Sequence, residues 1–205
     1  MKNNWEKMPS DKAVNETIDA VKKRGIEVFL VNDRKEALEK IIELIPKGAE
    51  VMNGSSTTLN EIGFSDFLKN GKHGWKNLHD EILMEKDMAK QGDLRRKATA
   101  AEYFLGSVNA ISKNGELVSC DNSGSRVGAY LFSAKNLILV TGVNKITGSI
   151  DEAMQRSREH VFALENERAK KVYGFPSNVS KWAIIEKEIN PNRIKLILIK
   201  EKLGF

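Results

Sequence analysis

The first 60 residues alternate amphipathic helical patterns with short apolar runs, and this alternation constrains the fold more than any other feature. From Ser10 to about Arg24, the apolar residues Val14, Ile18 and Val21 recur at the spacing of one helical face. A strand-length apolar run follows this helical pattern, and a second such run follows the next helical pattern along the chain. The order helix, strand, helix, strand predicts an α/β fold with a parallel sheet and helices on its faces.

Later apolar runs extend the predicted sheet. Its expected strands are Ile26–Val31, Glu50–Asn53, Asn136–Thr141 and Ile194–Ile199. The pair Asn114-Gly115 separates two further short apolar runs and predicts a β-hairpin. No linker, internal repeat or low-complexity tract interrupts residues 1–205, so we expect one domain, with residues 69–92 as a candidate small inserted subdomain.

Cysteine, histidine and charge usage exclude several classes of protein. The single cysteine, Cys120, allows no disulfide within the chain, favours a reducing compartment and cannot build an iron–sulfur cluster by itself. The three histidines lack metal-ligand spacing, so we expect neither a metal nor a cofactor. The 33 basic and 28 acidic residues interleave along the chain, which favours a solvated surface over a nucleic-acid site. With no apolar signal segment or membrane span, we predict a cytoplasmic protein; a homo-oligomer is left open.

Three polar loops follow predicted strands, at the sheet edge where open α/β folds bind ligands. The first loop, Gly54-Ser55-Ser56-Thr57-Thr58, combines a close backbone approach with hydroxyl donors and a helix start, which suits phosphate or carboxylate; a plain helix cap explains it equally well. In the second loop, residues 121–126, Asp121 and Arg126 flank a glycine turn. They either grip an anionic ligand or form an ion pair that braces the turn.

The third loop, Gly142-Val143-Asn144-Lys145, follows the predicted strand Asn136–Thr141, whose apolar run indicates full burial. Its lysine is either a mobile charge that meets an anion or plain surface. If the three loops share one edge of the sheet, we expect them to converge on one pocket for an anion. No Ser–His–Asp order or carboxylate pair is present to identify a catalytic centre.

At these loops the chain resembles the LUD domain, the module of lactate-utilization proteins also called DUF162. The matching segments are GSSTTLNEIG at 54–63, RRKATAAEYFLGSVNAISKNGELVSCDNSGSRVG at 95–128 and NLILVTGVNKI at 136–146. They occur in the family's order, and the resemblance covers most of residues 13–170. It implies a Rossmann-like fold similar to the sugar isomerase and CoA-transferase superfamily. It also implies a role in the oxidation of L-lactate to pyruvate beside iron–sulfur partner proteins.

The resemblance also implies a set of ligand-binding residues. They are Ser55, Ser56, Thr57, Asn109, Asp121, Gly124, Arg126, Asn144 and Lys145, with Arg95 or Arg96 matching a further family arginine; the polar loops themselves add Gly54 and Ser123 as candidate ligand-binding residues. Many family members carry a cysteine-rich C-terminal segment, but residues 172–205 contain no cysteine, which leaves a substrate other than lactate open. The alternative is a free-standing isomerase- or transferase-like enzyme acting on a small phosphorylated or carboxylated substrate, with Asp121 as the best candidate for its base.

Overall fold

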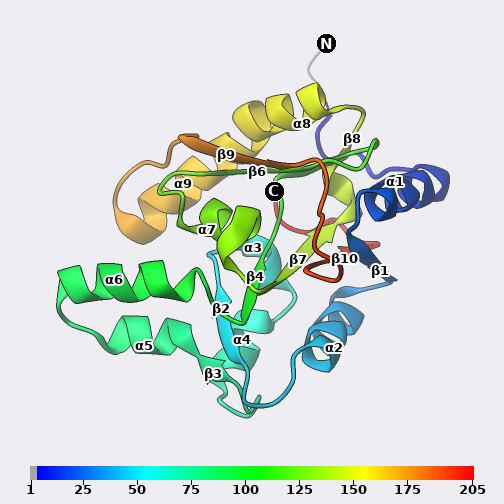
Figure 1. Cartoon of the computed structure of the whole chain (residues 1–205). Helices are drawn as coiled ribbons and strands as arrows, with labels where there is room; N and C mark the ends of the chain where they lie inside the picture. The colour runs from blue at the N-terminus through cyan, green and yellow to red at the C-terminus, as the bar shows by residue number, and fades with distance from the viewer. Residues whose placement is uncertain (1–3) are drawn as a thin grey trace.

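The computed structural model describes residues 4–205 and is built around a six-stranded, all-parallel sheet (Figure 1). The strand order is β1-β10-β7-β4-β2-β3. The strands are β1 (Glu27–Val31), β2 (Glu50–Asn53), β3 (Lys76–Asn77), β4 (Tyr103–Gly106), β7 (Asn136–Gly142) and β10 (Ile194–Ile199). All four predicted strands lie in this sheet, and the predicted parallel α/β fold is confirmed.

One face of the central sheet is covered by helices from the first third of the chain. They are α2 (Arg34–Leu44), α3 (Thr57–Glu61) and α4 (Phe64–Lys69). Along β7, Ile138 and Val140 point to this face, whereas Leu137 and Leu139 point to the other. Because both faces of the strand are buried, its sequence is continuously apolar rather than alternating.

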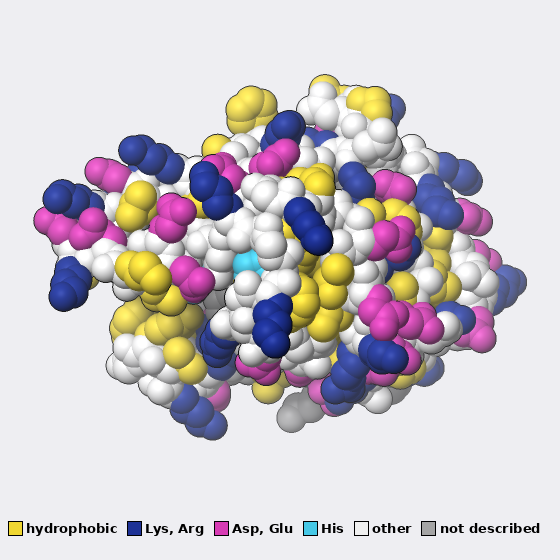
Figure 2. Space-filling model, turned by 90° about the horizontal axis from the view of Figure 1, so that it is seen from below, with side chains coloured by type: hydrophobic (Ala, Val, Ile, Leu, Met, Phe, Trp, Pro, Cys, Tyr) yellow, Lys and Arg dark blue, Asp and Glu magenta, His cyan; other side chains and the backbone are white. Residues whose placement is uncertain are grey.

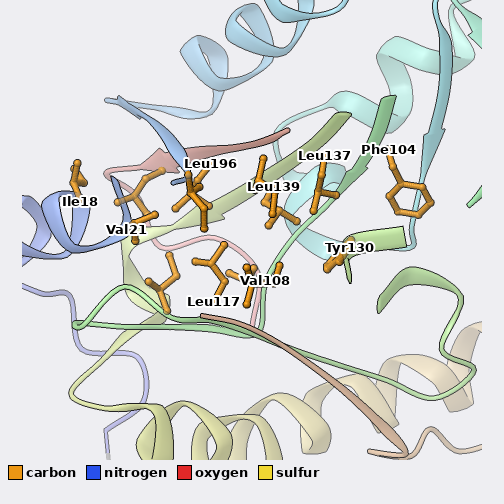
Figure 3. Close-up of a cluster of buried hydrophobic side chains, with 14 of the residues drawn as sticks. Ile18, Val21, Phe104, Val108, Leu117, Tyr130, Leu137, Leu139 and Leu196 are labelled. Carbon is orange, nitrogen blue, oxygen red and sulfur yellow. The ribbon is translucent and has the colours of Figure 1, made fainter. Parts of the chain in front are cut away.

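A second sheet and helix α1 (Asp11–Lys23) pack on the opposite face of the central sheet (Figure 3). Its order is β8-β5-β6-β9, and its strands are β5 (Ala110–Ser112), β6 (Leu117–Asp121), β8 (Ile146–Thr147) and β9 (Lys181–Ile185). The predicted hairpin is confirmed as the antiparallel β5–β6 pair, in which Gly115 adopts a φ of 97°. The sequence did not predict β9, which pairs with β6.

Two helices cover the outer side of the second sheet (Figure 1). They are α8 (Ile150–Arg156) and α9 (Phe162–Tyr173), joined by a π-helical turn over Ser157–Val161. Ala153 of α8 packs on Ala110 and Val118 of the sheet. Residues 150–173 therefore form one long helical segment with a π-helical turn inside it.

The candidate subdomain at 69–92 contains β3, helix α5 (Leu78–Met84) and the start of α6 (Met88–Ala98). Strand β3 pairs with β2 through the register Glu50 to Lys76 and Val51 to Asn77. The segment therefore begins as an edge strand of the central sheet before its two helices extend away from it (Figure 1).

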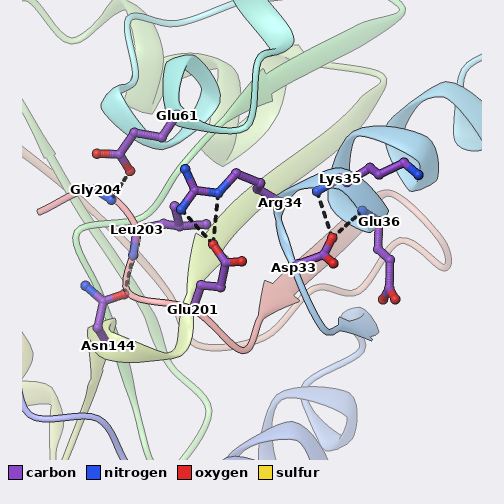
Figure 4. A network of polar contacts seen from close by, with 9 residues as sticks. All are labelled: Asp33, Arg34, Lys35, Glu36, Glu61, Asn144, Glu201, Leu203 and Gly204. Carbon is purple, nitrogen blue, oxygen red and sulfur yellow. Dashed lines mark hydrogen bonds and ion pairs between the residues drawn. The ribbon is translucent and has the colours of Figure 1, made fainter.

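The last residues of the chain are held by side chains from three segments (Figure 4). Arg34 forms an ion pair with Glu201 at 2.9 Å, Asn144 Oδ1 accepts from the Leu203 amide at 3.1 Å, and a Glu61 carboxylate oxygen accepts from the Gly204 amide at 2.6 Å. Residues 201–204 thereby lie against the end of helix α3 and the turn that follows β7.

On the face seen from below, Lys and Arg side chains are mixed with Asp and Glu side chains (Figure 2). No helix within residues 4–205 combines the length and the apolar character needed to cross a membrane.

Candidate functional site

A cavity of about 610 Å³ opens where the carboxyl ends of β2 and β4 approach the end of β6. Its wall contains all the predicted ligand-binding residues except Gly124 and Asn144. Two of the three polar loops reach it from the parallel sheet, as the sequence predicted. The remaining loop, at 121–126, follows β6 of the second sheet, so the expectation that one parallel sheet supplies all three loops is wrong.

The loop after β2 contributes backbone and hydroxyl groups. Ser56 is a helix cap, because its Oγ accepts from the Leu59 amide at 3.2 Å. Helix α3, which it caps, has only five residues and supplies a weak dipole, so the predicted contribution of a helix end is small. Ser55 is exposed and Thr57 partly buried, and both line the cavity.

We call residues 120–126 the arginine turn. Its Asp121 Oδ2 accepts from the Arg126 amide at 3.0 Å, and Arg126 Nη2 donates to the Cys120 carbonyl at 2.6 Å. Gly124 turns the chain with a φ of 93° and leaves room for the Lys181 side chain. The Asp121 side chain therefore braces the turn by binding the Arg126 backbone amide, and the partly buried Arg126 side chain lies in the cavity wall.

Arg126 also connects the arginine turn to the loop after β2. Its guanidinium lies 5.9 Å from the centroid of the Tyr130 ring, a cation–π contact. A Cβ at Gly54 would lie 2.8 Å from Arg126 Cδ, so glycine at this position permits the close approach of the two loops. The structure thus brings residues 54 and 126 into contact, although 72 positions separate them in the sequence.

We call Lys145 and its three hydrogen-bond acceptors the lysine centre. Lys145 Nζ lies 3.1 Å from Thr58 Oγ1, 3.1 Å from Ser107 Oγ and 3.2 Å from the Val108 carbonyl oxygen. These partners follow β2 and β4, and Lys145 follows β7, so the centre occupies the carboxyl ends of three neighbouring parallel strands. The side chain is 3% exposed, so the prediction of a mobile or surface charge is wrong.

Burial lowers the pKa of Lys145 to about 7. The positive charges of Arg156 and Arg126 lower this pKa as well, whereas Glu61 acts in the opposite direction. An amine with such a pKa is largely neutral in slightly alkaline solution.

Two predicted site residues use their side-chain oxygens to hold the backbone of other segments. Asn144 does not line the cavity; its Oδ1 accepts from the Leu203 amide and so holds the C-terminal segment. Asn109 does line the cavity, but its Oδ1 accepts from the Cys120 amide at 2.8 Å and its carbonyl accepts from Arg156 Nη1 at 2.6 Å. Both asparagines therefore position their neighbours.

The sequence did not identify the wall formed by α9. Glu165 and Arg168 pair there through two contacts of 2.7 Å, and the ring of Tyr173 lies 5.3 Å from the Arg168 guanidinium. Burial by itself raises the pKa of Tyr173. Hydrogen bonds with Ser55 and Arg168 have the larger opposite effect, so the pKa lies below its usual value. In sequence this i, i+3 ion pair resembles an ordinary solvated helix face, so no signal distinguished it.

The helical segment after β3 adds His79 and Arg95 to the cavity wall. Burial lowers the pKa of His79, which favours the neutral imidazole. Arg95 or Arg96 matches a family arginine by resemblance; Arg95 lines the cavity, whereas Arg96 pairs with Asp93 at 2.7 Å.

The cavity contains little that could hold a metal or act as a reactive thiol. Cys120 lines it, but burial raises the pKa of the thiol to about 11, so the thiol stays protonated. Within the described part of the chain, no three His, Cys, Asp or Glu residues cluster closely enough to hold a metal ion. The chemistry available here is anion binding by Arg126, hydrogen bonding by hydroxyls and an amine at Lys145.

Comparison with known proteins agrees with this architecture. A crystal structure of a DUF162 family protein from Deinococcus radiodurans matches with a TM-score of 0.54 and 13% identity, covering 93% of this chain and 99% of that one. No curated protein sequence matches the chain. The family model described as LUD domain matches residues 14–199, nearly the whole chain, and the chain belongs to the LUD domain family.

Proposed function

We propose that this LUD domain protein binds a small carboxylate in its cavity, of the class of L-lactate and its 2-oxo acid. The observation that carries the proposal is the position of Arg126 in the cavity wall, beside Gly54 and the hydroxyl-bearing loop that follows it. A guanidinium has five N–H donors, and the bond from Nη2 to Cys120 leaves donors for a two-point contact with a carboxylate.

The cavity also suits the remainder of a hydroxy acid. Ser55 and Thr57 offer hydroxyls that bind an oxygen of the ligand, while Phe104 and Val108 supply apolar wall for its carbon atoms. Small-molecule sites commonly combine apolar walls with a few polar groups in this way. The cavity is large for lactate alone, so it also has room for a larger 2-hydroxy acid.

The proposal is tested by calorimetric titration of L-lactate and pyruvate into the wild type and Arg126→Ala. A charge-assisted contact contributes roughly 1.5–3 kcal/mol, so the variant should bind about ten- to a hundredfold more weakly. Its melting temperature should fall only modestly, because the variant also loses the bond to the Cys120 carbonyl and the contact with Tyr130. Lys181→Ala is the matched control, because Lys181 contacts the same turn through the Ser123 carbonyl yet does not line the cavity.

Two results would contradict carboxylate binding. One is a wild type that binds neither acid. The other is an Arg126→Ala variant that melts at a lower temperature but keeps its affinity, because Arg126 would then only brace its own turn.

We also propose that the chain acts beside iron–sulfur partner proteins when a hydroxy acid is oxidised. Such clusters normally require about four cysteine thiolates, and this chain has one cysteine. The chain alone should therefore bind L-lactate without reducing an added dye that accepts electrons. Reduction of the dye by the purified chain would show that no partner is needed.

A further inference from the structure

Lys145 is a buried amine, and within residues 4–205 no carboxylate is bonded to it. Its three hydrogen-bonding partners are two hydroxyls and one carbonyl. Glu61, the acidic residue that acts on its charge, gives a carboxylate oxygen to the Gly204 amide instead. Buried ammonium groups are normally paired with an acid, so this arrangement disfavours the charged form.

The three partners suit a neutral amine. Such an amine has two N–H donors and one lone pair; the Val108 carbonyl can only accept, whereas the hydroxyls of Thr58 and Ser107 can donate or accept. These two hydroxyls lie 3.3 Å from each other, so protons can pass between them. The lowered pKa of Lys145, about 7, agrees with this geometry.

Lys145 also has access to the proposed ligand. It lines the same cavity as Arg126, together with Thr58, Ser107 and Val108. On its other side the backbone of Gly204 lies close, because a Cβ there would lie 2.9 Å from Nζ. The amine is thus confined between the C-terminal segment and the cavity.

We infer that Lys145 is a nucleophile that forms an imine with the keto carbon of a 2-oxo acid whose carboxylate is held by Arg126. The inference rests on the carboxylate site proposed above and adds a covalent step to it. Neutral amines in desolvated positions are the lysines that react in this way. An exposed lysine such as Lys181 lacks such a desolvated position.

The step balances without any oxidant or cofactor. The lone pair of Lys145 Nζ forms a bond to the keto carbon, and the electrons of the C=O π bond move to the oxygen, which takes a proton. Nitrogen then loses a proton, which gives the neutral carbinolamine. Its hydroxyl takes a second proton and leaves as water while the nitrogen lone pair forms the C=N bond, and loss of the remaining N–H proton gives the imine. Ser107 and Thr58 are placed to accept and return the protons.

The test is reductive trapping with pyruvate as the probe. The intact protein is incubated with pyruvate and sodium cyanoborohydride, and its mass and its peptides are measured. We expect one adduct on Lys145, with the mass of pyruvic acid less one oxygen atom. L-lactate, which has no carbonyl at that carbon, should give no adduct.

Lys145→Arg and Lys145→Met should lose the adduct, while Lys181→Arg should keep it. Circular dichroism and L-lactate titration establish that the Lys145 variants are folded and retain the Arg126 site. Pyruvate binding by the wild type without a trapped adduct would overturn the imine and leave carboxylate binding intact. Equal labelling of the wild type and Lys145→Met would also overturn it, because the labelled groups would then be surface lysines. Failure of the wild type to bind pyruvate or lactate would overturn both proposals.

Discussion

The arginine turn and the lysine centre place two cationic residues in one cavity, yet their environments are opposite. Arg126 is partly exposed, projects from a turn that follows the second sheet and lies over an aromatic ring. Lys145 is buried at the ends of three parallel strands, and its pKa is lowered to about 7. A guanidinium keeps its charge in almost any setting, whereas an ammonium loses its proton readily when desolvated. The difference suggests a division of labour, with permanent charge for binding at one end and a neutral amine for chemistry at the other.

The first prediction is that the free energy of unfolding depends on pH through Lys145 and not through Arg126. Between the folded pKa of about 7 and the ordinary value of 10.5, the unfolded chain holds a proton on Lys145 that the folded chain lacks. The free energy of unfolding should therefore rise with pH, by roughly 2 kcal/mol from pH 7 to pH 9. Urea denaturation at both pH values measures the rise, and Lys145→Met should remove it.

Other charged groups also act on Lys145. The test is therefore the difference between wild type and variant, rather than the size of the rise in the free energy of unfolding. Arg156 and Arg126 lower its pKa and Glu61 raises it, but each is present in both wild type and variant. Arg126→Met should keep most of the rise, since this substitution removes only one of the charges involved. An equal rise in the wild type and Lys145→Met would mean that Lys145 stays protonated in the folded protein.

The second prediction is that contacts with the C-terminal segment stabilise the fold around the lysine centre but do not contribute to lactate binding at the arginine turn. Asn144→Ala removes the acceptor for the buried Leu203 amide, which should lower the free energy of unfolding by about 1–2 kcal/mol. L-lactate affinity should stay near that of the wild type, because Asn144 does not line the cavity. Thermal melts and titration measure the two effects.

Asn122→Ala is the control for this substitution. Asn122 is exposed, and its Oδ1 accepts from Ser180 Oγ at 3.3 Å, so its removal should change stability little. A large loss of lactate affinity in Asn144→Ala with normal stability would show that Asn144 binds the ligand directly, as the family resemblance implies.

Strands could be predicted from the sequence where both of their faces are buried. Strands β7 and β10 lie between layers, so each is a continuous apolar run that the sequence displays openly. Strand β9 has one side in the core and alternates buried with less buried residues, and its partner β6 lies 60 positions earlier. Neither its composition nor its neighbours in sequence indicate that pairing.

The site was predictable to the extent that its groups share a loop. Gly54 to Thr57 and the arginine turn each carry their polar groups within a few positions, and both line the cavity. The environment of Lys145 could not be foreseen, because its partners come from two other segments and its burial depends on the C-terminal residues. Interactions of this kind arise only when distant strands are aligned in the sheet.

The last and smallest predicted effect concerns the contact that joins the arginine turn to the loop after β2. In Gly54→Ala the new methyl group would lie 2.8 Å from Arg126 Cδ and 3.0 Å from Cγ, so the flexible arginine side chain must move. The backbone at Gly54 is not in the left-handed region, so alanine itself is not strained there. L-lactate should therefore bind about three- to tenfold more weakly, a difference of up to about 1.4 kcal/mol, with nearly unchanged stability.

Gly128→Ala is the matched control, because a Cβ there meets nothing within 4 Å, and its affinity should equal that of the wild type. Trapping of pyruvate on Lys145 should persist in Gly54→Ala at saturating pyruvate, because the lysine centre has no contact with residue 54 among its hydrogen bonds. If the variant loses the trapped adduct but binds lactate normally, the assignment of binding to Arg126 and chemistry to Lys145 is wrong.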